Sequence, residues 1–407
     1  MRLKFQPAPK AIYFEQNATP AEWGSWHWQL RRSLKSRADF ERVFDLASEE
    51  SAAFSGSGEL QAFQIRTTPY YASLASTTEP LDPIRLIFMP RKEELSLGVQ
   101  DQLDPLGEKK NNPAPRLIHR YPDRVLFLVT DFCSVYCRYC TRKHFTGGEQ
   151  AFAREDDYTK ALQYISAHPE IREVILSGGD PLTLSDDVLA KVLTDIRRID
   201  HVEIIRIGSR MPVVNPMRIT LELAALLRSV KPVYMMTHFN HPRELTAEAA
   251  EGLERLVDHG VPIFNQMVLL NGVNNDPRIV QALSRRLLYL RVKPYYMFQC
   301  DPSQGTDHLR TSIDESLEIQ RALWGTLSGL AMPTYSVDIP DGGGKTTLVP
   351  DFELRDQRTG TVESGITRVY RGWDGVQAEY KSPPLERRRT PLDAEVYSDE
   401  WATLLRR

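Results

Sequence analysis

The stretch VLFLVTDFCSVYCRYC, residues 125–140, decides how the chain folds and where its chemistry lies. Its first six residues are apolar or β-branched, which is typical of a buried strand. The strand runs directly into a loop whose cysteines have the spacing C-x3-C-x2-C. A buried strand followed at once by such a loop is expected where parallel strands end at a functional site.

Further apolar or β-branched runs follow this strand, at residues 173–177, 202–207, 233–239, 263–270, 293–299 and 334–339. Helical patterns lie between the runs, at about 158–167, 186–198, 219–230, 245–259, 277–290 and 313–330. Alternation of this kind places parallel strands inside and helices outside. We therefore predict an α/β fold, a partial (β/α) TIM-like barrel of about six parallel strands.

Polar or glycine-containing segments follow these strands. They are 130–131, 177–180, 208–210, 237–241, 300–301 and 338. Because barrel enzymes gather their chemistry at the carboxyl ends of the strands, these segments are predicted to line one site.

The barrel is predicted to occupy residues 121–350, with a region of different character on each side. Residues 1–120 form an N-terminal helical region and linker, with a helix-start pattern at 19–23 and a loop at 101–115. Residues 351–407 form a C-terminal extension whose role the sequence does not indicate. The arginines at 387–389 are predicted to be solvated surface.

Composition excludes several classes of function. The formal net charge is −3 and the isoelectric point about 6.3, which does not suggest a dedicated nucleic-acid or membrane partner. No apolar run is long enough to span a membrane, and the N-terminus lacks the apolar core of a signal peptide. We expect a cytoplasmic protein.

Cysteine use points to a metal centre. Of the four cysteines, Cys133, Cys137 and Cys140 lie within eight residues, and Cys300 follows 160 residues later, so this is no disulfide framework. Three thiolates can hold three irons of a [4Fe–4S] cluster and leave the fourth iron open to a small molecule. The alternatives are a zinc site, which normally takes four ligands, and three unrelated buried cysteines. The spacing favours the cluster.

A glycine-rich loop, DIPDGGGKT at 338–346, carries a lysine. It departs from a phosphate-binding P-loop because Ile339 stands where the first glycine is needed, and an extended stretch ending at Pro350 follows. Lys345 could instead form an imine with pyridoxal phosphate. Taken alone, such a loop is more often a mobile surface turn.

The cysteine loop, with an aromatic residue before Cys140, resembles the radical S-adenosylmethionine superfamily. More widely, the chain resembles the lysine 2,3-aminomutase family, through segments 26–31, 119–124, 130–142, 176–180, 206–210, 237–242, 300–301 and 338–345. The resemblance implies an isomerase that moves the α-amino group of a basic amino acid from C2 to C3. The conversion of L-lysine to β-lysine is the first expectation. It also implies a [4Fe–4S] cluster, S-adenosylmethionine, pyridoxal 5′-phosphate and an electron donor such as flavodoxin or ferredoxin. We expect a homo-oligomer.

Matching positions supply the site residues that the resemblance implies. The iron ligands are Cys133, Cys137 and Cys140. The contacts to S-adenosylmethionine are Ser177, Gly178, Gly179, Asp180, His238 and Gln266. Pyridoxal phosphate is carried by the catalytic Lys345 and held by Arg120, Tyr121 and Arg124. The substrate is bound by Arg142 at its α-carboxylate and by Asp301 and Asp338 at its side-chain ammonium. Read alone, the arginines would be solvated surface and His238 a core histidine.

The chain departs from the family pattern at four places. Tyr139 stands where histidine is common, Lys143–His144 replaces an arginine pair, Pro302 replaces leucine, and Asp341 stands where the glycine run begins. The departures leave the exact substrate open among lysine, arginine, ornithine and a lysine in a protein. A radical enzyme without pyridoxal phosphate and a non-catalytic metal-binding interaction protein are further alternatives. No cysteine follows Cys300, so we expect no C-terminal structural zinc of the kind that some family members carry.

Overall fold

The computed structural model describes residues 3–54, 63–96, 98, 100, 102–147 and 151–382. The chain divides into two compact units, residues 1–350 and 351–407. The arginine run at 387–389 lies outside the described residues, so its predicted exposure stays a prediction. Among the described residues, no helix is both long and apolar enough to cross a membrane.

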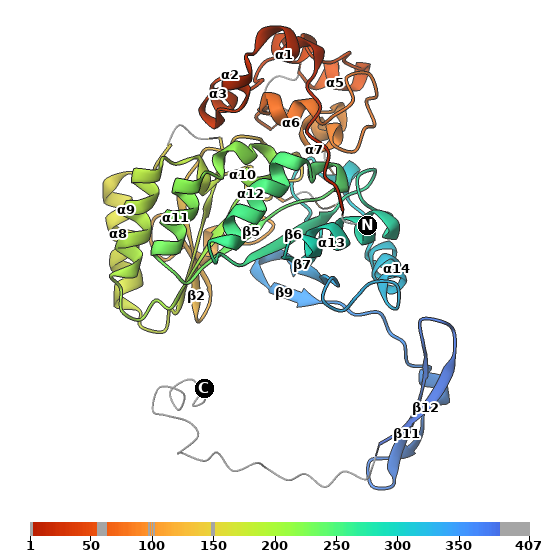
Figure 1. Cartoon of the computed structure of the whole chain (residues 1–407). Helices are drawn as coiled ribbons and strands as arrows, with labels where there is room; N and C mark the ends of the chain where they lie inside the picture. The colour runs from red at the N-terminus through yellow and green to blue at the C-terminus, as the bar shows by residue number, and fades with distance from the viewer. Residues whose placement is uncertain are drawn as a thin grey trace. The chain divides into compact units, whose positions relative to one another are not determined.

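The first unit is built on a nine-stranded sheet whose spatial order follows the chain, β1 to β9 (Figure 1). Its parallel strands are β2 (Arg124–Thr130), β3 (Glu173–Gly178), β4 (Ile204–Gly208), β5 (Val233–Thr237), β6 (Ile263–Leu269), β7 (Val292–Gln299) and β8 (Thr334–Ile339). Two antiparallel strands flank them, β1 (Leu117–Tyr121) beside β2 and β9 (Gly344–Thr347) beside β8. The predicted fold class is confirmed. Each of the seven predicted runs forms a parallel strand, one more than the predicted total of about six, and the pattern did not indicate the two flanking strands.

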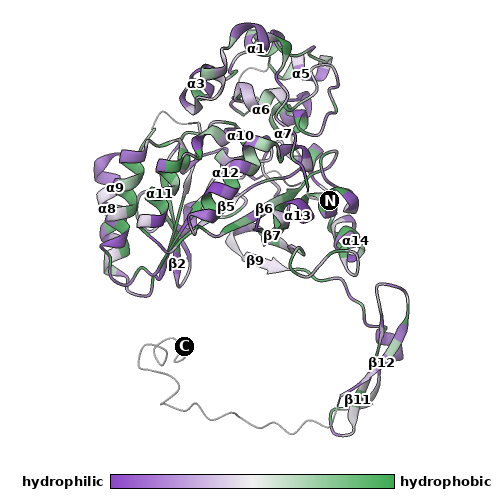
Figure 2. Cartoon of the chain, in the orientation of Figure 1, coloured by the Kyte–Doolittle hydropathy of each residue, from purple (hydrophilic) through white to green (hydrophobic). Residues whose placement is uncertain are grey.

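Helices connect successive parallel strands. They are α8 (Glu155–Ala167), α9 (Asp186–Arg197), α11 (Leu221–Ser229), α12 (Ala247–Asp258), α13 (Pro277–Tyr289) and α14 (Ile313–Leu323), with the short α10 (Met211–Val214) after β4. Several begin at a side-chain cap, as at Ser185, Thr220 and Thr246, where the hydroxyl accepts a hydrogen bond from the first turn. Figure 2 shows that the long helices carry both hydrophilic and hydrophobic residues. In α9 the buried residues are Leu189, Val192, Leu193 and Ile196, the spacing of a helix with one face on a core.

The last predicted helix is shorter than the pattern indicated. It was expected over 313–330, but α14 ends at Leu323 and Trp324 has extended backbone angles. Gly325 follows with a φ of +77°, a left-handed conformation that suits glycine and ends a helix.

Short helices make up the N-terminal part of the first unit, as predicted. They are α1 (Ile12–Asn17), α2 (Pro20–Trp23), α3 (Trp26–Arg31), α4 (Arg37–Glu41), α5 (Ser48–Ala53), α6 (Pro69–Ser73) and α7 (Arg85–Phe88). The helix-start pattern at 19–23 is a capping box between Thr19 and Glu22. Arg85 and Glu50 form a fully buried ion pair that joins α7 to α5. Such short helices depend on packing rather than on their own propensity.

The second unit contains a three-stranded antiparallel sheet, β10 (Thr359–Thr361), β11 (Gly365–Arg371) and β12 (Gln377–Lys381). None of its described residues is buried. The sequence analysis did not predict these strands, because their residues are mixed in polarity and show no alternation between a buried and an exposed face.

The turn after β3 packs directly on the loop after β2. The amide of Gly179 donates to the carbonyl of Thr130 at 2.6 Å, and the amide of Asp180 donates to the carbonyl of Phe132 at 2.8 Å. A Cβ at position 179 would lie 2.2 Å from the Phe132 oxygen. Gly178 has a φ of +122°, which a residue with a side chain rarely adopts. The Gly–Gly pair therefore allows the cysteine loop and the β3 turn to meet backbone to backbone.

We predict that Gly179→Ala lowers the unfolding free energy by about 1–3 kcal/mol, the usual cost of forcing extra atoms into a packed site. The control is Gly329→Ala, because a Cβ at position 329 would have no atom within 4 Å. Urea or thermal unfolding followed by circular dichroism measures both variants. Equal unfolding midpoints for the two variants would contradict the close packing of the turn on the cysteine loop.

Candidate functional site

A single cavity of about 520 Å³ lies at the carboxyl ends of the parallel strands. All of the predicted site residues line it, although they are spread over more than half of the chain. They are Arg120, Tyr121, Arg124, Cys133, Cys137, Cys140, Arg142, Ser177, Gly178, Gly179, Asp180, His238, Gln266, Asp301, Asp338 and Lys345. The fold thus brings the whole predicted set together, while the role of each residue stays a prediction.

The three clustered cysteines lie on the wall of this cavity, and Cys300 is buried outside its lining. Burial, the Asp180 carboxylate and the neighbouring thiols raise the pKa of Cys133 well above its usual value. Burial and Cys137 also raise the pKa of Cys140. Negative charge on neighbouring buried sulfur atoms needs a cation to compensate it. This donor set therefore fits an iron cluster.

Arg210 is a cationic neighbour of Cys137. Its Nη1 donates to the Sγ of Cys137 at 2.8 Å, and its Nη2 donates to Glu244 at 2.8 Å and to the hydroxyl of Tyr71 at 3.0 Å. Its Nε donates to the backbone carbonyl of His238 at 3.2 Å. Arg210 therefore joins the cysteine loop to the turns after β4 and β5.

His238 and Tyr139 line the same part of the cavity. Burial, Arg210 and Arg142 lower the pKa of His238 to about 3, so its imidazole is neutral at physiological pH. The hydroxyl of Tyr139 accepts a hydrogen bond from Asn240 at 2.7 Å. A neutral imidazole and an anchored phenol can contact a ligand without adding charge to the site.

The Asp180 carboxylate accepts hydrogen bonds from other residues of the protein. It accepts from the hydroxyl of Ser209 at 2.7 Å and from the amides of Leu182 at 3.0 Å and Arg210 at 2.8 Å. Burial nevertheless raises its pKa. In the geometry observed, Asp180 holds the turns after β3 and β4 together and also faces the cavity.

Lys345 lies at the other end of the cavity, on β9. Its ammonium is 3.1 Å from Asp338, and its backbone amide donates to the hydroxyl of Tyr121 at 2.9 Å. Arg120 also donates to Asp338, at 3.2 Å. The guanidinium of Arg124 lies over the Tyr121 ring, 4.1 Å from its centre. These contacts place two cations and a phenol around the lysine loop, a donor set that fits a phosphorylated ring cofactor.

A second carboxylate, Asp301, lies near Asp338. Burial and the Asp338 charge raise the pKa of Asp301 to about 7, although Lys345, Arg310 and Arg120 act in the opposite direction. This raised pKa means that the cations nearby do not fully compensate the negative charge of the ionised Asp301 carboxylate. The end of the cavity that contains both aspartates can therefore accept a further cation.

Arg142 lies near the cysteines, where its charge opposes the rise in the pKa of Cys133 and Cys140. Its Nε donates to both oxygens of Glu108 at 2.9 and 3.1 Å, and its Nη1 donates to Ser177 at 3.1 Å. Its guanidinium still lines the cavity, so it can meet an anionic group there.

Several polar residues that line the cavity were not predicted from the sequence. They are Glu108, Ser134, Arg206, Ser209, Arg210, Tyr295 and Tyr296. Arg206, Ser209 and Arg210 belong to a segment that the analysis quoted, so a role for them could have been proposed. Glu108 lies in a loop without periodic pattern, and nothing in its sequence neighbourhood signals its contact with Arg142.

Comparison with known proteins places the chain in a family. The model described as "Radical SAM superfamily" matches residues 127–280, and the model described as "Lysine-2,3-aminomutase" matches residues 320–401. The L-lysine 2,3-aminomutase of Fusobacterium nucleatum is 43% identical over 91% of this chain and 85% of that protein. The L-lysine 2,3-aminomutase of Clostridium subterminale is 41% identical over 90% of this chain and 86% of its own length.

A relative with another substrate in its name is nearly as similar. The glutamate 2,3-aminomutase of Clostridioides difficile is 40% identical over 90% of this chain and 85% of that protein. Sequence identity over the whole chain therefore indicates the reaction class. It does not distinguish lysine from glutamate as the substrate, which depends on the residues of the site. The chain belongs to the lysine 2,3-aminomutase family within the radical S-adenosylmethionine superfamily, and it is an isomerase that moves an amino group within one molecule.

Proposed function

We propose that this enzyme converts L-lysine to β-lysine by moving the α-amino group from C2 to C3. The observation that carries the proposal is the pair of carboxylates, Asp301 and Asp338, in the cavity that also holds Lys345, Arg142 and the cysteines. Lysine has an α-carboxylate at one end and an ammonium at the other. An arginine and a pair of aspartates in one cavity can bind these two ends together.

Membership of the radical S-adenosylmethionine superfamily implies a [4Fe–4S] cluster and S-adenosylmethionine. Cys133, Cys137 and Cys140 are the proposed iron ligands. The bound cluster and S-adenosylmethionine supply the one-electron chemistry that starts the isomerisation. The chain's own contribution is a wall made of the buried Ser177, Gly178 and Asp180 and the half-buried Gly179, His238 and Gln266, which is proposed to bind the cofactor and exclude water. A flavodoxin or ferredoxin is the proposed reductant.

Pyridoxal 5′-phosphate is the third proposed cofactor, attached through Lys345. Bound there, it supplies an electron-withdrawing ring that makes migration of the amino nitrogen feasible. The support is the set of groups at Lys345: Tyr121 binds its backbone amide, Asp338 holds its ammonium, and Arg120 and Arg124 provide positive charge for a phosphate.

The substrate ends are assigned by charge. Arg142 is proposed to bind the α-carboxylate, and Asp301 with Asp338 the side-chain ammonium. The side-chain carboxylate of glutamate would be repelled by both aspartates, which disfavours glutamate as substrate. A lysine within a protein chain has no free α-carboxylate for Arg142. Arginine and ornithine carry the same charges as lysine and are the alternatives.

We expect the anaerobically purified enzyme, with its cluster rebuilt and with both other cofactors and a strong reductant present, to form β-lysine from lysine. Arginine, ornithine and glutamate are offered separately, and mass spectrometry after derivatisation identifies each β-amino acid. Iron and sulfide analysis should give about four of each per chain. Product from glutamate in preference to lysine would overturn the roles proposed for Asp301 and Asp338.

The KM for lysine should fall as the pH rises through about 7. A protonated Asp301 cannot pair with an ammonium, and its pKa in the enzyme without substrate is raised to about 7. One pH unit below that value, only about a tenth of the carboxyl groups are ionised. Asp301→Asn should raise the KM on the order of tenfold to a hundredfold and remove this pH dependence. Steady-state kinetics between about pH 6 and 8 test it, and an unchanged pH profile in the variant would refute the assignment.

A further inference from the structure

Residues 102–111, called here the bridging loop, contact Arg142 and the segments next to Asp301 and Lys345. The amide of Gln102 donates to the carbonyl of Pro302 at 2.9 Å, and the amide of Gln304 donates back to the carbonyl of Gln102 at 3.1 Å. The loop therefore pairs with the segment that directly follows Asp301. It then leads through a short 3-10 helix, η3 (Lys109–Asn111), toward β1.

The same loop reaches the pyridoxal end of the cavity. The carbonyl of Leu106 accepts from Nη1 of Arg120 at 3.1 Å. A Cβ at Gly107 would lie 2.9 Å from the backbone of both Asp341 and Gly342, so the bridging loop and the lysine loop touch closely. Gly107 has a φ of +61°, which lets the chain turn at this contact.

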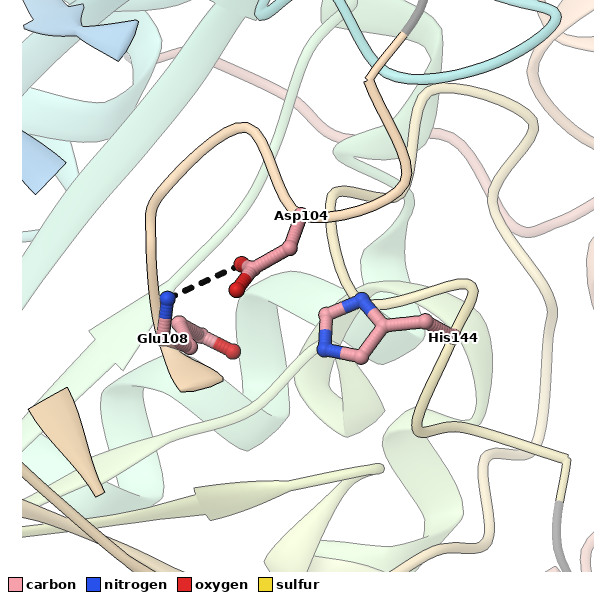
Figure 3. Close-up of side chains that lie close together, drawn as sticks. All are labelled: Asp104, Glu108 and His144. Carbon is pink, nitrogen blue, oxygen red and sulfur yellow. Dashed lines mark hydrogen bonds between the residues drawn. The ribbon is translucent and has the colours of Figure 1, made fainter. Parts of the chain in front are cut away.

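Glu108 is the residue through which the bridging loop contacts Arg142. Its side chain is buried, and both of its oxygens accept from Nε of Arg142. Asp104 fixes the position of Glu108, because its carboxylate accepts from the amides of Glu108 and Lys109, each at 2.9 Å. Figure 3 shows the Asp104 carboxylate directed at the Glu108 amide, with the imidazole of His144 facing both acidic side chains.

We propose that Glu108 is a positioning residue that aims Arg142 at the substrate α-carboxylate, and that the bridging loop sets its distance from Asp301 and Lys345. This inference rests on the role proposed for Arg142. A guanidinium held at Nε and Nη1 presents its remaining amino group in a fixed direction. Without Glu108 the long side chain of Arg142 would be free to adopt other rotamers before substrate binds.

Three of the residues that depart from the family pattern lie against this loop, whereas Tyr139 hydrogen-bonds to Asn240 and Lys143 to the carbonyl of Gln304. Pro302 accepts a hydrogen bond from it, Asp341 lies against Gly107, and His144 faces Asp104 and Glu108. Side chains that touch the loop can shift Arg142 relative to the aspartates without touching the substrate. The bridging loop is therefore the place where the length of the accepted amino acid is set.

A metal ion is the competing explanation for this cluster. Asp104, Glu108 and His144 offer ligand atoms within 4.8 Å of one another. However, both Glu108 oxygens already face the Arg142 guanidinium, and both Asp104 oxygens accept backbone amides. A cation at this point would lie beside the positive charge of Arg142 and would be repelled by it.

The test compares Glu108→Gln with wild type and with Lys109→Gln, an exposed residue of the same loop. Glu108→Gln should raise the KM for lysine on the order of tenfold to a hundredfold, because misplacing a binding group by about 1 Å has effects of this size. The value of kcat should change less. Lys109→Gln should leave both values near those of wild type, and Glu108→Asp should recover part of the loss.

A second readout separates positioning from general damage. Wild type should bind lysine more tightly than lysine amide, which lacks the carboxylate, and Glu108→Gln should reduce that preference toward one. Equal weakening of both ligands would overturn the proposal, as would an unchanged KM. Metal analysis of His144→Ala gives a further check. One divalent ion fewer than in wild type would place Glu108 in a metal site and would overturn the proposal. If wild type itself converts no basic amino acid, the proposed function has failed instead.

Discussion

Buried negative charge is the constraint around which the site is organised. Three thiols occupy one part of the cavity, and Asp301 and Asp338 occupy another. An unpaired buried charge is costly, so each group needs a cation nearby. Arg210 serves Cys137, and Lys345 with Arg120 serves Asp338. Compensation is incomplete at the thiols and at Asp301, and these are the two places where a cationic cluster and a cationic substrate are proposed to bind.

The topology explains how distant residues share one cavity. Strand order follows chain order, so the loop after β2 and the loop after β8 belong to opposite ends of the row of parallel strands. Nevertheless Arg120 on β1 is 3.2 Å from Asp338 on β8. The sheet must therefore curve until its two ends approach each other. The flanking strands β1 and β9 supply Arg120, Tyr121 and Lys345, so the proposed pyridoxal phosphate site is built where the curved sheet nearly closes.

Features that depend on residues close together in the chain could be predicted from the sequence, and contacts between distant residues could not. Parallel strands and amphipathic helices follow from local periodicity, so all of the parallel strands were predicted. The strands β1 and β9 were not, because the segments HRYP and GGGK lack an apolar pattern. Arg142 could be matched by motif, but Glu108 could not, because their contact joins residues 34 positions apart through a loop without regular structure. Residues that position others leave the weakest trace in a single sequence.

A partial barrel has an opening that a complete barrel lacks, and the bridging loop lies at that opening. It pairs with the segment after β7, touches the turn after β8 and leads into β1. Asp338 lies on β8 and Asp301 lies just after β7, so the sheet fixes the positions of both proposed substrate-binding carboxylates. Arg142 instead lies on the cysteine loop, and Glu108 is proposed to direct its side chain. One end of the substrate site is thus set by the sheet and the other by a loop. Under the roles proposed here, a change in the loop would move Arg142 relative to Asp301 and Asp338 and would leave the cysteines and Lys345 in place.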